Sequence, residues 1–357
     1  MFNRRMLLKA AAILTVAATS QAWAGDGKVK VVATFSVLGD MVSRIGGDHV
    51  ALTTLVGPNG DAHVYQPVPA DAKAVSRADL LVVNGLAFEG WLDRLVEASD
   101  FKGVRVVATD GINAIPFGED EHHDDEKNDD GHGDHADHKD DDHASHKDDD
   151  HAKHKDDDHG DEHAGHKDED GHHDDHAGHE HGAYDPHAWQ SLVHAVTYVD
   201  NITAALSKVD PANAAVYYQN RAAYVAEIEA LEAEVQASVA ALPENARTVV
   251  TPHDAFGYFA DAYGLRFEAP QGLSTESEPS AADVADLIRQ IRAEDIKAVF
   301  LENIADARLL KQIADETGAA IGGSLYSDAL SEPEGPAGTY LDMIRHNTKT
   351  LVGALDS

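Results

Sequence analysis

Short, nearly uninterrupted apolar stretches recur along the chain and alternate with longer stretches of helical period. Apolar runs of this length that stop at turn residues are typical of strands buried on both faces of a parallel sheet. Four such strands are predicted in each half of the chain: Val29–Ser36, Ala51–Gly57, Leu80–Gly85 and Val104–Asp110, then Thr248–His253, Leu265–Pro270, Ala298–Asn303 and Ala319–Tyr326. The alternation predicts an α/β protein.

Helical patterns lie between these strands, over Val37–Ile45, Ser280–Ala293 and Ala305–Thr317, and the longest runs from Pro211 to Leu242. Ser280 followed by Asp283 is a capping signal. The long helix has apolar residues at a spacing of three and four: Ala215, Tyr218, Ala222, Val225, Ile228, Leu231 and Val235. We predict two doubly wound parallel-sheet lobes joined by one long rigid helix, with a ligand site in the interlobe cleft beyond the strands' carboxyl ends.

The first 24 residues have the pattern of an export signal. Arg4, Arg5 and Lys9 precede an apolar run over Ala10–Ala18, and Ala22-Trp23-Ala24 has the form of a cleavage site. The apolar run is too short to span a bilayer, which takes about 20 residues. We expect a cleaved signal peptide and a periplasmic mature protein. A retained anchor helix is the alternative, and a loose twin-arginine pattern leaves the export route open.

Residues 119–182 have a different composition, with 17 His, 27 Asp or Glu and 6 Lys among 64 residues, and neither aliphatic residues larger than Ala nor aromatic ones. Units similar to HKDDDHA begin at His138, His146 and His154, and HKDED begins at His166. Because no position is apolar, we predict a disordered loop. A polar spacer is one interpretation. The histidines, which include His179 and His181, favour a low-affinity collector of divalent cations.

Charge and cysteine content exclude several classes of protein. The formal net charge is −36, of which the loop carries −21, so an extended nucleic-acid interface is not expected. Without cysteine there is no disulfide framework, thiolate metal site or iron–sulfur cluster. The predicted organisation is a signal peptide over 1–24, a first lobe over 25–205, a linking helix over 206–243 and a second lobe over 244–357.

Six histidines lie outside the loop, and three of them stand at strand or loop ends rich in Gly, Pro or Asp. These are His63 in GPNGDAH, His187 in DPHAW and His253 in TPHDAF. A single histidine so placed would more often pack or cap, but three in one exported chain favour a shared metal. The other three lack this setting and are assigned structural roles: His49, His194 and His346.

The motifs GPNGDAH, DPHAW, PHDAFGYFADAYGL and LYSDALSEPEGPAGTYLDMIRHNT resemble the solute-binding proteins of cluster A-I ABC importers for zinc and manganese. The resemblance runs from Val29 to Leu355, in family order. It implies a metal held by His63, His187, His253 and Asp328, between two lobes bridged by one helix. Asp328 alone could equally be a helix N-cap.

The resemblance favours zinc, since His253 stands where manganese-specific members tend to carry Glu and a His-rich insertion precedes DPHAW. Three imidazoles and one carboxylate also suit tetrahedral Zn²⁺ better than manganese, which prefers more oxygen ligands. Asp61, Asp185 and Glu302 are candidates to hold the second imidazole nitrogens. The implied partner is an inner-membrane ABC permease, with a periplasmic metallochaperone as a further candidate, and we expect a monomer.

Three alternatives remain at this point: a zinc buffer or chaperone without a transporter, a manganese-binding homologue, and a zinc hydrolase. Catalytic zinc keeps an open position for water, whereas four protein ligands are available here. The chain has no HExxH helix. We therefore expect a non-enzymatic protein that captures Zn²⁺ and delivers it to an importer.

Overall fold

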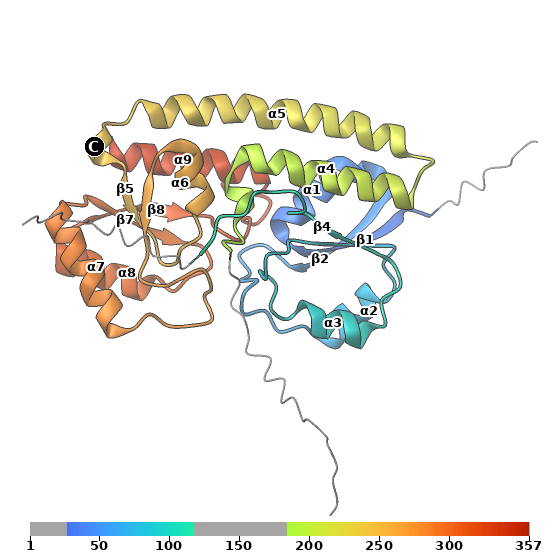
Figure 1. The fold of residues 1–357 in the computed structure, drawn as a ribbon, viewed down its shortest axis with the longest axis horizontal. Helices are drawn as coiled ribbons and strands as arrows, with labels where there is room; N and C mark the ends of the chain where they lie inside the picture. Colours follow the sequence, from blue (N-terminus) through green and yellow to red (C-terminus); the bar gives the residue numbers. More distant parts are fainter. Residues whose placement is uncertain (1–26, 118–183, 357) are drawn as a thin grey trace, which may run out of the picture. The chain divides into compact units, whose positions relative to one another are not determined.

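Two four-stranded parallel sheets form the framework of the computed structural model, which describes residues 27–117 and 184–356 (Figure 1). The first sheet has the order β2-β1-β3-β4 and the second β6-β5-β7-β8, so one topology occurs twice. The strands are β1 (Val29–Phe35), β2 (Val50–Val56), β3 (Leu80–Val83), β4 (Val104–Val107), β5 (Thr248–Val250), β6 (Arg266–Glu268), β7 (Ala298–Glu302) and β8 (Ala320–Leu325). The predicted fold class is confirmed.

Helices cover both faces of each sheet in Figure 1. The helices α1 and α4 lie on one side of the first sheet and α2 and α3 on the other, while α9 and α6 lie opposite α7 and α8 in the second lobe. Their bounds are α1 (Ser36–Gly46), α2 (Pro69–Val75), α3 (Leu92–Ser99), α4 (Leu192–Val209), α5 (Ala214–Ala240), α6 (Gly257–Tyr263), α7 (Ala281–Glu294), α8 (Ala307–Thr317) and α9 (Tyr340–Leu355). Short 3-10 turns are η1 (Gly47–His49), η2 (Ala188–Gln190) and η3 (Glu244–Ala246).

The central strands β1 and β3 of the first sheet consist almost entirely of apolar residues, and helices cover both of their faces. All four residues of β3 are buried, and β1 exposes only Lys30. Strand β1 pairs in parallel with both of its neighbours, with Val29 opposite Val50 of β2 and Val31 opposite Leu80 of β3. This packing directs the carboxyl ends of the strands, and the loops that follow them, to one edge of each sheet.

Helix α5 is the long helix that the sequence predicts, and it contacts α1 and α4 of the first lobe as well as α6 and α9 of the second. Its buried face begins with Tyr217 and Tyr224 and continues through Val225, Ile228, Leu231, Val235 and Val239. The expectation that Ala215, Tyr218 and Ala222 belong to this face is wrong, because all three are exposed, Tyr218 to 53 %. Residues 206–209 end α4, so α5 begins after the predicted start of the linking helix.

The capping signal at Ser280 is confirmed, since its hydroxyl accepts the backbone N–H of Asp283 at 3.2 Å. Within the described residues, we find no helix with both the length and the apolar character needed to cross a bilayer. The predicted signal peptide and the histidine-rich segment, including His138, His146, His154, His166, His179 and His181, lie outside the described residues.

Candidate metal centre

Each of the four predicted ligands lies in a loop, either after a strand or next to an isolated β-bridge. His63 lies in the loop after β2, His253 three residues after Val250 of β5, and Asp328 three residues after Leu325 of β8. His187 directly precedes η2, close to the isolated bridge that joins Tyr184 to Pro116. Loops at strand ends thereby bring side chains from both lobes to one place.

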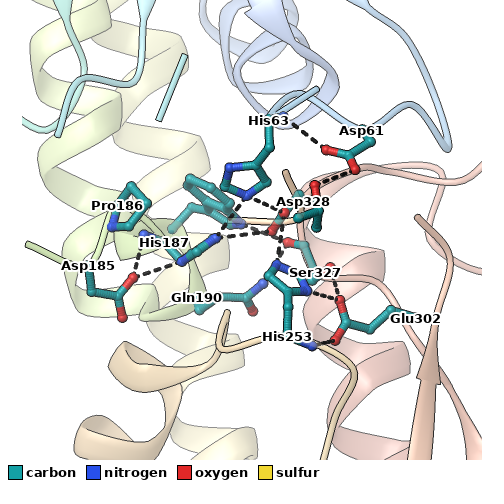
Figure 2. A network of polar contacts seen from close by, with 12 residues as sticks. Asp61, His63, Asp185, Pro186, His187, Gln190, His253, Glu302, Ser327 and Asp328 are labelled. Carbon is teal, nitrogen blue, oxygen red and sulfur yellow. Dashed lines mark hydrogen bonds and ion pairs between the residues drawn. The ribbon is translucent and has the colours of Figure 1, made fainter. Parts of the chain in front are cut away.

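The four side chains converge, and their ligand atoms lie within 4.8 Å of one another (Figure 2). Asp328 Oδ2 lies 3.1 Å from His63 Nε2 and 3.2 Å from His253 Nε2. His187 Nε2 lies 3.6 Å from Asp328 Oδ1 and 3.4 Å from His63 Nε2. A tetrahedral zinc ion with ligands at about 2.0–2.1 Å separates its ligand atoms by about 3.3–3.4 Å. The spacing therefore fits a small tetrahedral cation.

All four groups are withdrawn from solvent, with an exposed fraction of 6 % for His63 and 0 % for the other three. Phe88 and Trp189 form an aromatic wall against which His63 and His187 pack edge-on. Aromatic packing of this kind fixes the ring orientations and keeps water away from the polar atoms.

Two of the three candidate supporting carboxylates, Asp185 and Glu302, lie in contact with an imidazole. Asp185 Oδ1 accepts from His187 Nδ1 at 2.8 Å, and Glu302 Oε2 lies 2.6 Å from His253 Nδ1. A carboxylate at Nδ1 keeps the proton there and leaves the lone pair of Nε2 free to bind a cation.

Asp61 differs from this expectation, because it does not support the ring of His63. Its Oδ1 accepts the backbone N–H of His63 at 2.9 Å, and its Oδ2 accepts the hydroxyl of Thr275 at 2.6 Å. The sequence places Asp61 and Asp185 alike, two residues before a histidine. In the structure Asp185 reaches both the backbone N–H and the ring of His187, whereas Asp61 reaches the backbone N–H of His63 and the hydroxyl of Thr275.

Ser327 is a supporting residue that the sequence did not reveal. Its hydroxyl donates to Glu302 at 2.7 Å, and its carbonyl accepts from Trp189 Nε1 at 2.9 Å and Gln190 Nε2 at 2.7 Å. These bonds link the first lobe to the residue that precedes Asp328. The neighbouring LYSD motif gives only the position of Ser327, and no pattern signals its partners.

The electrostatics of the cluster favour a proton where a cation is absent. Burial would lower the pKa of His253, but the facing carboxylates of Glu302 and Asp328 outweigh it and hold that pKa well above its usual value. Burial would raise the pKa of Asp328, but His253 and His187 hold it well below its usual value. The site therefore has a strong affinity for positive charge.

The histidines assigned structural roles lie elsewhere. His49 packs on Tyr217, and His194 packs edge-on against Tyr258. His346 Nε2 bonds the carbonyl of Ser324 at 3.0 Å. In the part of the chain that the structure describes, only His63, His187, His253 and Asp328 form a group of this kind.

Comparison with known proteins gives the same family over nearly the whole chain. Residues 31–354 match the family described as zinc-uptake complex component A, periplasmic (ZnuA). The manganese-binding lipoprotein MntA of Halalkalibacterium halodurans is 30 % identical over 93 % of this chain and 89 % of its own. The iron-binding protein YfeA of Yersinia pestis is 30 % identical over 91 % of this chain and 85 % of its own.

Solved structures agree with the fold. The periplasmic zinc-binding protein TroA of Treponema pallidum aligns with a TM-score of 0.71 and 27 % identity, over 92 % of this chain and 99 % of its own. The manganese-bound periplasmic metal-binding protein of Candidatus Liberibacter asiaticus gives a TM-score of 0.69 with 29 % identity, over 92 % of this chain and 100 % of its own. The chain therefore belongs to the ZnuA family of metal-binding, substrate-binding proteins of ABC importers.

Proposed function

We propose that this protein captures Zn²⁺ in the periplasm and delivers it to an ABC permease in the inner membrane. The observation that carries the proposal is the convergence of His63, His187 and His253 through Nε2 on Asp328, at separations of 3.1 to 3.6 Å. With neutral imidazoles and one carboxylate, these ligands and Zn²⁺ have a net charge of +1. Asp185 and Glu302, in contact with the rings, offset that charge.

The choice of zinc over manganese rests on the donor set. Three nitrogen donors suit Zn²⁺, whereas Mn²⁺ prefers carboxylate, carbonyl and water oxygens. Relatives of this chain carry names that refer to manganese and to iron, so manganese is the second candidate. Among the four groups, only Asp328 supplies oxygen, and both of its oxygens face the histidines.

The proposed role is binding and delivery, not catalysis. Catalytic zinc keeps one position for water or substrate. Here Asp328 offers the fourth donor, is fully buried, and lies within 3.6 Å of each histidine. A zinc buffer without a transporter would use the same four residues, and the family membership favours import. The proposal also includes a monomeric protein and a periplasmic metallochaperone as a further candidate partner.

Competitive titration tests the site and its metal. We expect one tight site per chain that binds Zn²⁺ at least about a hundredfold more tightly than Mn²⁺. For one set of donors the affinity for Zn²⁺ exceeds that for Mn²⁺, and three imidazoles widen the difference. His63→Ala should weaken that site by about a hundredfold or more, whereas His194→Ala should leave it unchanged, since His194 lies away from the cluster.

Two results would contradict the proposal. A preference for Mn²⁺ would assign the protein to manganese transport, and an equal loss in both histidine variants would place the tight site elsewhere. The titration uses a chelator of known affinity as competitor, so that ions bound weakly to other histidines do not enter the measured constant.

A further inference from the structure

His63 is held differently from the other two histidines of the cluster. It is the only one of the four groups with measurable exposure, 6 %. His187 and His253 each have a carboxylate at Nδ1, but no carboxylate among the described residues contacts Nδ1 of His63. The position of this ring therefore depends on the backbone that carries it and on the packing against Phe88.

Asp61 controls that backbone, and it uses both carboxylate oxygens to do so. Oδ1 accepts the N–H of His63 at 2.9 Å, and Oδ2 accepts the hydroxyl of Thr275 at 2.6 Å. Figure 2 shows Asp61 beside His63, on the side of the cluster away from Asp185. One side chain thus joins a predicted metal ligand of the first lobe to a hydroxyl of the second.

Thr275 lies between β6 and α7 of the second lobe, 214 residues from Asp61. The same first-lobe loop has two further bonds to the second lobe, both through Asn59. Its N–H donates to the carbonyl of Leu330 at 2.9 Å, and its Oδ1 accepts from Asn303 Nδ2 at 3.2 Å. Asn59 has a φ of 54°, a left-handed conformation that Asn tolerates, so the turn geometry fixes this contact. The loop before His63 is therefore fastened to the opposite lobe.

We propose that Asp61 and Thr275 form an interlobe latch that positions His63 and sets the rate at which the bound metal leaves. The inference rests on the proposed function and adds to it which residues govern release. In this proposal the ion leaves past His63, the least buried of its ligands, and His63 moves aside when its loop separates from the second lobe. Opening the latch breaks the hydroxyl bond to Asp61 and frees the carboxylate that fixes the N–H of His63.

The size of the effect follows from the bond. Loss of a hydrogen bond to a charged group changes a rate or an equilibrium constant by about tenfold to a hundredfold. Both Asp61 and Thr275 are partly exposed, which places the effect at the lower end. Loss of the hydroxyl should raise the rate of metal release about tenfold.

The test uses the full chain loaded with one equivalent of Zn²⁺, and it follows release into excess chelator by stopped flow. Thr275→Val removes the hydroxyl and keeps the shape, and we expect release about tenfold faster than in the wild type. Thr275→Ser keeps the hydroxyl and should restore the wild-type rate. Thr350→Val is the matched control and should not change the rate. Thr350 is a partly exposed threonine of α9 whose hydroxyl lies 3.4 Å from His346 Nε2.

The melting temperature of the metal-free protein separates positioning from stability, and Thr275→Val should change it by no more than about 3 °C. A release rate within twofold of the wild type in Thr275→Val overturns the latch, as does equally fast release from Thr275→Ser or from Thr350→Val. If the wild type itself holds no zinc ion tightly, the proposed function fails and the latch with it. If the wild type binds zinc and Thr275→Val releases it normally, only the latch fails.

Discussion

The chemistry of His253 shows how a buried imidazole can be prepared for a cation. Glu302 lies against Nδ1 at 2.6 Å and Asp328 against Nε2 at 3.2 Å, so both ring nitrogens face a carboxylate. Burial opposes protonation, but these two charges raise the pKa of His253 well above its usual value. A proton at Nε2 of His253 therefore competes with Zn²⁺ for the same position.

Zinc binding should release protons and weaken as the pH falls. A group whose pKa is raised on folding stabilises the metal-free fold below its unfolded pKa of about 6.5, and this stabilisation is lost as the pH rises through the raised folded pKa. Zinc competes with that proton, so its affinity should decrease from pH 7.5 to pH 5.5. Calorimetry in buffers of different ionisation enthalpy should give an observed binding enthalpy that changes with the buffer. A buffer-independent enthalpy together with equal affinity at both pH values would contradict a histidine-dominated site.

At the residue scale, the sequence predicts which side chains meet but not which atoms do. His63, His187 and His253 stand out because each follows a strand or a loop in a turn, and the fold brings such positions together. Asp61 shows the limit. It stands two residues before His63 as Asp185 stands before His187, yet it accepts from the backbone N–H of His63 and not from its ring. That difference depends on loop geometry and on Thr275, a residue far away in the sequence.

At the scale of the element, α5 shows why the buried face of a helix can be predicted one residue away from its true position. Alanine-rich stretches give a weak apolar pattern, and Tyr217 and Tyr218 are adjacent. Tertiary contacts decide between them, because Tyr217 is buried and donates its hydroxyl to Asp210 at 2.7 Å. From Val225 onward, larger apolar residues make the period unambiguous, and the predicted and observed faces coincide at Val225, Ile228, Leu231 and Val235.

The buried face of α5 should therefore contribute strongly to stability. Ile228 is 1 % exposed, so Ile228→Ala should lower the free energy of unfolding by about 2–5 kcal/mol through lost burial and an unfilled cavity. Denaturant unfolding of the metal-free protein measures this. Glu229→Ala changes the next residue, which is exposed, and should alter the same quantity by no more than about 0.5 kcal/mol. Equal effects of the two substitutions would show that this face of α5 is not packed as described.

At the scale of the whole molecule, the described residues that flank the histidine-rich segment on either side are adjacent. Pro116 and Tyr184 form an antiparallel bridge, and the N–H of Asp185 donates to the carbonyl of Ile115 at 2.9 Å. Asp185 also supports His187, so the same connection reaches the candidate metal centre. A short linker can therefore replace the segment, because it has to join only two neighbouring points of the fold.

Deletion of residues 119–182, joined by a short Gly/Ser linker, separates the two kinds of binding that the sequence predicts. The 17 histidines of that segment should account for the weak zinc sites, while the four groups of the cluster lie outside it. We expect zinc titration of the deleted chain to retain one tight site with a dissociation constant within about threefold of the full chain, and to lose the weak sites. A second variant keeps the segment at full length with serine in place of every histidine, and it controls for the change in chain length. Loss of the tight site from both variants would place it in the segment, and survival of the weak sites in both would remove the basis for a collecting role.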